Sequence, residues 1–189
     1  IAAQADMGER ISNIVMMGIG EPLDNYESTL KFLELVGAPD GLNIGARHIS
    51  LSTCGLVDKI DALAKCDKQI TLSISLHAAT DEKRSEIMPV NNKWKIKELL
   101  DACVYYYSVT QRRISFEYTL ILGKNDTEAD AKELANLLKN AFRGTGAPLH
   151  VNLIRVNEVA ETGFKKGTDE SARAFAAALE RQGVVATVR

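Results

Sequence analysis

The feature that most constrains this chain is an alternation of short apolar runs with helical patterns along its whole length. The apolar and β-branched runs predict strands, and the segments between them place apolar residues at helical spacing. Strands that alternate with helices run parallel and are joined by right-handed crossovers, so the pattern predicts an α/β fold. The predicted strands are residues 14–17, 47–53, 69–76, 113–122, 149–156 and 184–188.

The segments between the strands carry recognisable helix caps. Asn25, Thr127 and Thr168 are residue types that cap helix N-termini, with Asp24 and Asp126 as neighbouring alternatives. The helix after Asn25 is expected to end at Gly37 and to bury an apolar stripe of Leu30, Leu33, Leu35 and Val36. Residues 80–82 are expected to open only a short turn. The other predicted helices are residues 2–11, 56–64, 96–106, 127–141 and 168–181.

Most of the predicted strands end in small or polar residues. Because ligands bind beyond the carboxyl ends of parallel strands, these residues are expected to converge on one face. An open doubly wound sheet and a barrel sector both suit the pattern. We favour the barrel sector because every unit has polar residues at its strand end and none carries a full phosphate-binding fingerprint. The strand ends are residues 18–21, 52–55, 75–77, 123–125 and 157.

The first strand end, Gly18-Ile19-Gly20-Glu21-Pro22, does not support a dinucleotide site. It lacks the third glycine of G-x-G-x-x-G, and Pro22 intervenes where a helix should begin. Gly18 and Gly20 nevertheless let the main chain approach a ligand closely, and Glu21 then lies at the rim. A lone Gly-x-Gly is more often an ordinary strand-to-helix turn, so the other strand ends decide the interpretation.

Composition and charge bound the function. The 189 residues, 46% hydrophobic and 25% charged, predict one globular domain spanning residues 1–189. The formal net charge of −2 gives no bulk attraction to nucleic acid. Any RNA contact would need local basic groups, and such groups are more often solvated surface. The candidates are Lys93, Lys95 and Lys97 around Trp94, Arg112 with Arg113, and Lys165 with Lys166.

The cysteines and the single histidine at a strand end have ordinary interpretations when taken alone. Cys54, Cys66 and Cys103 are odd in number and widely spaced, which favours reduced thiols and a cytoplasmic location. His77 alone is more often a packed or hydrogen-bonded residue than a ligand. No apolar run predicts a membrane span, and residues 1–4 show no signal-peptide pattern.

Taken together, the strand ends and the segments after them form an ordered set of motifs that resembles the radical S-adenosylmethionine ribosomal-RNA methyltransferases. The resemblance covers nearly all of the chain, and several motifs in order are far more specific than any one of them. The motifs are residues 16–23 (MMGIGEPL), 51–55 (LSTCG), 74–78 (ISLHA), Asp81-Glu82-x-Arg84, 88–91 (MPVN), Glu117-Tyr118 and 151–157 (VNLIRVN).

The resemblance implies a partial (β/α)6 barrel that binds S-adenosylmethionine at its strand ends. It implies no catalytic residue and no metal ligand within these 189 residues. The cosubstrate-binding residues that it implies are Gly20, Glu21, Ser52, Ser75, Leu76, His77 and Asn157.

The family's [4Fe–4S] cluster is bound by Cys-x-x-x-Cys-x-x-Cys on the loop after the strand that precedes the glycine-glutamate strand, and this triplet would lie upstream of Ile1. The methyl-carrying cysteine of the family would lie beyond Arg189. The chain is therefore expected to be the core of a longer polypeptide, without the cluster-bearing strand and unable by itself to bind iron or methylate RNA.

For the intact enzyme the resemblance implies methylation of carbon 2 of an adenine in 23S ribosomal RNA, with transfer RNA as a second candidate substrate and an electron donor for the cluster. Carbon 8, the target of the antibiotic-resistance relative, is the first alternative. A nucleotide-dependent oxidoreductase and a non-catalytic RNA-binding module are alternatives from other classes.

Overall fold

The computed structural model describes residues 6, 8–157 and 163–189, which form one parallel six-stranded sheet with helices. The strands follow one another across the sheet in chain order, and every neighbouring pair is parallel. All six predicted strands are confirmed, with slightly shorter bounds. They are β1 Ile14–Met16, β2 Ile49–Thr53, β3 Thr71–Ser75, β4 Ile114–Leu120, β5 His150–Arg155 and β6 Val185–Val188.

Helices follow the strands at the predicted positions. Half of the residues of the helix predicted for residues 2–11 lie outside the described residues. For residues 8–11 the prediction is wrong: they are not helical, and Gly8 has a left-handed backbone with φ 65°. The other five predicted helices are confirmed. The helices are α2 Tyr26–Gly37, α3 Val57–Ala64, α4 Asp81–Ile87, α5 Ile96–Thr110, α6 Glu128–Ala141 and α7 Asp169–Arg181, with 3-10 turns η1 Ala46–His48 and η2 Pro89–Asn92. In the described part of the chain, no helix combines the length and the hydrophobicity that crossing a bilayer requires.

Helix α4 corrects the prediction that residues 80–82 open only a short turn. The Thr80 side chain accepts a hydrogen bond from the Lys83 backbone N–H at 3.3 Å, and two acidic residues occupy the first turn. Both features stabilise a helix N-terminus, the second by opposing the helix dipole. Pro89 then begins η2, so the helix is limited to seven residues.

Helix α2 corrects the predicted burial of Leu35. Leu33 and Val36 are buried, but Leu35 is 56% exposed. Two residues along an α-helix turn by about 200°, so Leu33 and Leu35 point to opposite sides. The apolar stripe is therefore narrower than its composition suggests.

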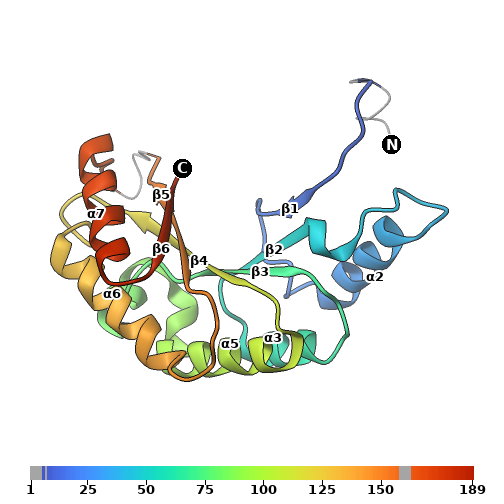
Figure 1. Ribbon diagram of the computed structural model, residues 1–189, viewed down its shortest axis with the longest axis horizontal. Helices are drawn as coiled ribbons and strands as arrows, with labels where there is room; N and C mark the ends of the chain where they lie inside the picture. The colour runs from blue at the N-terminus through green and yellow to red at the C-terminus, as the bar shows by residue number, and fades with distance from the viewer. Residues whose placement is uncertain (1–5, 7, 158–162) are drawn as a thin grey trace.

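The two faces of the sheet differ in chemistry. Leu51, Ile74 and Phe116 are buried in the hydrophobic core, and Figure 1 shows the helices along the outer side of the curved sheet. Side chains alternate along a strand, so the residues between them face the inner side. Ser52 pairs in register with Ser73 there. The inner face is consequently a polar surface with the sheet and its helices behind it.

Hydrogen bonds connect this polar face across the strands. The hydroxyl oxygens of Ser50 and Ser73 lie 3.2 Å apart, and Asn152 Nδ2 donates to Glu117 Oε2 at 2.6 Å. Glu117 is buried, and that burial raises the pKa of its carboxyl group, partly offset by the hydrogen bond from Asn152. The inner face is thus organised by side-chain pairs rather than by apolar packing.

The cap of α6 gives a direct test of this architecture. Thr127 Oγ1 accepts from the Asp130 backbone N–H at 3.2 Å, and Asp130 Oδ2 accepts from the Thr127 N–H at 3.0 Å. We expect Thr127→Ala to lower the free energy of unfolding by about 1 kcal/mol, because the Asp130 N–H in the first turn loses its acceptor. Denaturant unfolding followed by circular dichroism measures the loss. Thr127→Ser keeps the hydroxyl and is the matched control; equal losses in both variants would contradict the cap's role.

Candidate functional site

The carboxyl ends of β1, β2 and β3 enclose a cavity of about 160 Å³. Gly20 and Glu21 line it after β1, Ser52 at the end of β2, and Ser75 at the end of β3. Four of the seven residues predicted to bind a ligand are therefore brought together here. Its other lining residues are Met16, Met17, Gly18, Pro22, Thr53 and Cys54.

Glu21 joins the first two strand ends through main-chain hydrogen bonds. Its Oε2 accepts from the Cys54 N–H at 2.7 Å, and its Oε1 accepts from the Leu23 N–H at 3.0 Å. A carboxylate has about four acceptor positions; the two N–H groups and the Cys54 thiol occupy three of them, so one remains for a ligand. The arrangement presents a fixed, negatively charged acceptor to the cavity.

The Cys54 thiol is not activated. Burial raises its pKa to about 12, and a hydrogen bond to the Glu21 carboxylate acts in the same direction. The thiol is therefore protonated near neutral pH, which removes the nucleophilic and metal-binding form. This agrees with the interpretation of Cys54 as a packed small residue.

Ser52 and Ser75 reach the cavity from neighbouring strands. Ser52 pairs in register with Ser73, two residues before Ser75, so both serines lie on the inner face of the sheet. Ser52 is buried and Ser75 half-buried. Their hydroxyl groups supply hydrogen-bond donors and acceptors to the cavity, which Gly20 and Glu21 line from the segment after β1.

Leu76 and His77 continue β3 past its last ladder residue. The backbone N–H groups of both residues donate to the Glu117 carbonyl at 3.1 Å. The Leu76 side chain is fully buried, so only its main chain is available to a ligand. Neither residue lines the 160 Å³ cavity.

The protonation state of His77 follows from its contacts. The Thr119 N–H donates to Nδ1 at 3.0 Å, so a neutral ring carries its proton on Nε2. Burial, aided by the positive charge of Arg84, lowers the pKa of His77 to about 4. The backbone is left-handed at φ 60°, and Asn125 Nδ2 donates to the His77 carbonyl at 2.9 Å. His77 is thus a neutral imidazole in a fixed tautomer.

Asn157 lies apart from this cluster in the structure. It is exposed, two residues after the end of β5, and does not line the cavity of the first three strand ends. Residues 158–162, which follow it, lie outside the described residues. Its assignment to the site stays a prediction.

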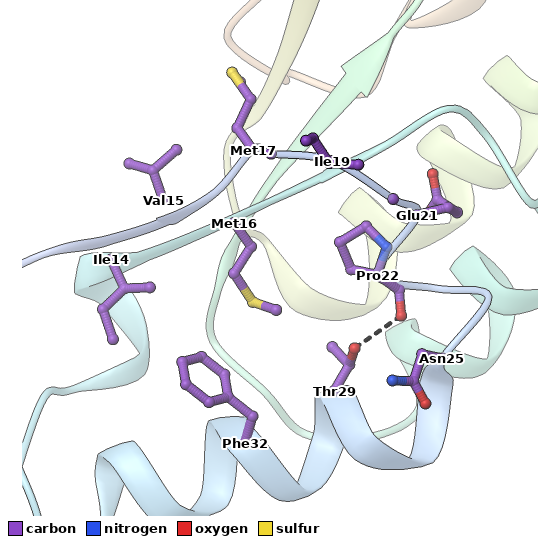
Figure 2. A pocket seen from close by; sticks show the side chains of 12 residues that line it. Ile14, Val15, Met16, Met17, Ile19, Glu21, Pro22, Asn25, Thr29 and Phe32 are labelled. Atoms are coloured by element: carbon purple, nitrogen blue, oxygen red, sulfur yellow. Dashed lines mark hydrogen bonds between the residues drawn. The ribbon is translucent and has the colours of Figure 1, made fainter.

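A second and larger hollow lies beside β1. This groove of about 560 Å³ is apolar, and Figure 2 shows Ile14 and Met16 pointing from β1 toward Phe32 of α2. At its end, Thr29 Oγ1 donates to the Pro22 carbonyl at 2.8 Å, the bond drawn in Figure 2. That bond ties α2 to the loop that presents the glycines and the carboxylate to the smaller cavity.

The described residues do not supply the ligands of an iron–sulfur cluster. Within them, no three histidine, cysteine or acidic side chains gather closely enough to hold a metal. The thiols lie in separate places: Cys54 faces Glu21, Cys66 Sγ is 2.9 Å from the Tyr26 hydroxyl, and Cys103 is fully buried in α5. Such clusters are held by several cysteine thiolates together.

Several of the candidate RNA-binding cations have partners within the protein. Lys97 pairs with Asp101 at 2.6 Å, and the Lys93 ammonium lies 3.9 Å from the centroid of the Trp94 ring. Neither observation indicates a continuous basic face.

Arg84 has a place near the site that its sequence motif does not predict. The motif Asp81-Glu82-x-Arg84 suggests no role for this arginine, yet its side chain is completely buried behind the strand ends. Its guanidinium donates to the carbonyls of Cys54, Ser75 and Leu76. An arginine in the sequence D-E-K-R reads as helix surface, so composition gives no signal for its burial.

Comparison with known proteins identifies the class. The model of the radical SAM superfamily matches residues 1–138, so the chain belongs to the radical SAM superfamily. A domain of the pyruvate-formate lyase-activating enzyme from Bacteroides vulgatus superposes with a TM-score of 0.66 at 18% identity, covering 95% of this chain and 99% of that domain. This likeness concerns the fold alone, and it confirms the predicted parallel α/β barrel sector.

Within the superfamily, the sequence groups with the proteins named RlmN, and the predicted resemblance is confirmed. The chain is 58% identical over its whole length to a "probable dual-specificity RNA methyltransferase RlmN" of Clostridium perfringens strain 13, and 51% identical to that of Clostridium botulinum strain Hall. A radical SAM methyltransferase from Sphaerobacter thermophilus superposes over the whole chain with a TM-score of 0.92 at 42% identity. The chain spans about half of each relative, 53%, 54% and 53% respectively.

The low pKa of His77 predicts a pH dependence of stability. The pKa of His77 is about 4 in the folded state against an ordinary 6.5, so the unfolded chain binds more protons between these values. The contribution of His77 to the free energy of unfolding is therefore largest above about pH 6.5 and decreases as the pH falls toward 4. We expect His77→Asn, which keeps an acceptor for the Thr119 N–H and tolerates a left-handed backbone, to flatten this fall by on the order of 2 kcal/mol.

Unfolding free energies measured from pH 7 to pH 4 in both proteins test this expectation. If the two curves run parallel across the interval, His77 does not exchange a proton on unfolding there and the assignment of its neutral state fails.

Proposed function

We propose that the chain is the S-adenosylmethionine-binding core of a radical SAM methyltransferase that modifies carbon 2 of an adenine in 23S ribosomal RNA. The observation that carries the proposal is the single cavity that collects Gly20, Glu21, Ser52 and Ser75 in a chain similar to RlmN proteins over its full length. On this view residues 1–189 form one core domain of a longer enzyme.

The chemistry of the cavity suits the methionine end of S-adenosylmethionine. The remaining acceptor position of Glu21 would receive the ammonium group, and Gly20 leaves the main chain open to close approach. The hydroxyl groups of Ser52 and Ser75 would hydrogen-bond the carboxylate and the ribose. These groups occupy little volume, so they satisfy the ligand without filling the cavity.

Three further residues are assigned to the nucleoside end. His77 would donate from Nε2–H, because Nδ1 is already occupied by a main-chain donor. Leu76 would act through its main chain, since its side chain is buried. Asn157 would complete the site from the segment after β5 with an amide that both donates and accepts.

When bound, S-adenosylmethionine supplies the methyl group and, with a reduced [4Fe–4S] cluster, the radical of this class of enzyme. The described residues bind, orient and shield the cosubstrate, and they do not hold the cluster. RNA substrate and an electron donor are the implied partners of the whole enzyme, and a cytoplasmic location fits them.

Two substrate questions belong to this proposal. The relatives are named dual-specificity RNA methyltransferases, which supports transfer RNA as a second substrate beside ribosomal RNA. Carbon 8 of adenine is the competing target position. The comparisons favour neither an oxidoreductase nor a non-catalytic binding module.

Nucleoside analysis tests the proposed reaction. We expect 23S ribosomal RNA and transfer RNA to lack 2-methyladenosine in a strain without the gene, and to regain it when the full-length enzyme is restored. Liquid chromatography with mass spectrometry separates 2-methyladenosine from 8-methyladenosine. Appearance of the 8-methyl product instead would overturn the carbon-2 assignment, and no methylated adenosine in either RNA would overturn the reaction.

Alanine substitutions at Ser52 and Asn157 test the proposed pocket. In the full-length enzyme we expect Ser52→Ala and Asn157→Ala each to weaken S-adenosylmethionine binding roughly ten-fold, the cost of one lost hydrogen bond to a charged or polar ligand group. Isothermal titration calorimetry measures the affinity. Ser50→Ala is the matched control, because Ser50 lies on the same face of β2 but pairs with Ser73 instead of lining the cavity. Unchanged affinity in both test variants would remove these residues from the site.

A further inference from the structure

Arg84 of α4 is a charged side chain with no exposed surface. Its guanidinium makes four hydrogen bonds to the protein. Nε donates to the Leu76 carbonyl at 3.1 Å, and Nη2 donates to the carbonyls of Cys54 at 2.8 Å and Ser75 at 3.2 Å. Nη1 donates to Asn91 Oδ1 at 3.0 Å. One side chain therefore holds the main chain of two adjacent strand ends.

Those carbonyls belong to the segments that line or border the proposed pocket. Cys54 and Ser75 line the cavity, and the Cys54 N–H donates to the Glu21 carboxylate at 2.7 Å. A continuous path of hydrogen bonds thus runs from Arg84 through Cys54 to Glu21. The path links the ends of β1, β2 and β3, the three strands around the cavity.

The way in which the charge is buried indicates a positioning role. Within the described residues Arg84 forms no ion pair with a carboxylate: its hydrogen bonds go to carbonyl and amide oxygens, and Asp81 acts on its charge only without contact. Burying a charge costs desolvation free energy, and an apolar side chain of similar volume often stabilises a fold equally well. What an apolar side chain cannot do is hold three carbonyls in one fixed arrangement.

Asn91 holds the guanidinium in place. Asn91 is fully buried, and its Nδ2 donates to the Asp81 carbonyl at 3.1 Å and to Ser85 Oγ at 2.8 Å, so its Oδ1 is aimed at Arg84. Gly55 has φ 106°, and a Cβ there would lie 2.9 Å from a Leu99 methyl group and 3.4 Å from Arg84 Nη2. The amide anchors the arginine, whereas the glycine is required by the Leu99 side chain and by its own left-handed backbone.

We infer that Arg84, anchored by Asn91, is a positioning residue for the cosubstrate: it fixes the ends of β2 and β3 at the spacing that S-adenosylmethionine binding requires. The inference rests on the proposed function and extends it to two residues outside the cavity. It accounts for the motifs Asp81-Glu82-x-Arg84 and Met88-Pro89-Val90-Asn91, to which the pocket itself assigns no contact.

The decisive measurement is the split between KM and kcat in the full-length enzyme. Arg84→Lys keeps the charge but cannot bridge three carbonyls with one small ammonium group. We expect it to raise the KM and the Kd for S-adenosylmethionine at least ten-fold, with kcat at saturating cosubstrate within about three-fold of the wild type. Leu134→Ala is the control: Leu134 is a buried residue of α6, so its truncation should lower Tm without changing the strand ends.

The inference is overturned if folded Arg84→Lys binds S-adenosylmethionine with wild-type affinity, or if Leu134→Ala raises KM as much. Asn91→Ala decides the question where Arg84→Lys does not fold: it removes only the anchor, and we expect a smaller rise in KM at unchanged kcat, whereas no rise would overturn the inference. Failure of the proposed function is distinguishable, because the wild-type enzyme would then not bind S-adenosylmethionine at all.

Discussion

The site depends on one constraint, the two-residue alternation of side chains along parallel strands. Ile74 enters the hydrophobic core, whereas its neighbours Ser73 and Ser75 face the inner surface. A shift of one residue in any strand would exchange these faces and expose the core. The same register that buries the apolar residues therefore brings the hydroxyl groups of Ser52 and Ser75 to a shared edge, where the loop after β1 adds the Glu21 carboxylate.

The alternation is also why so much of the fold could be predicted from the sequence. Apolar runs such as residues 14–17 and 113–122 mark strands, and Thr127 and Thr168 begin helices through local hydrogen bonds that the sequence shows directly. The strand-end residues Gly20, Glu21 and Ser52 could be placed on one edge for the same reason. These features rest on local chemistry and on period, which a single sequence contains.

The remainder depends on contacts between distant residues. Nothing near Arg84 in the sequence indicates that it meets carbonyls eight and thirty residues away. Leu76 looks like a binding residue in a motif, but the structure buries its side chain completely. Leu35 looks like part of an apolar stripe, but its angle around the helix leaves it exposed. In each case the environment of the side chain is set by the three-dimensional arrangement of the helices and strands, which the local sequence pattern does not contain.

Main-chain N–H groups fix the orientation of the side chains at the pocket. Glu21 is held by the N–H groups of Leu23 and Cys54, and His77 Nδ1 is held by the Thr119 N–H. A ligand then meets groups whose orientation is already set, so binding loses little freedom in the protein. Arginine suits the centre of such an arrangement because its planar guanidinium carries five donors in fixed directions, which the single ammonium of lysine does not. The cost of burying its charge is consistent with a gain in the geometry of the strand ends, where we propose that the cosubstrate binds, and not in the stability of the sheet.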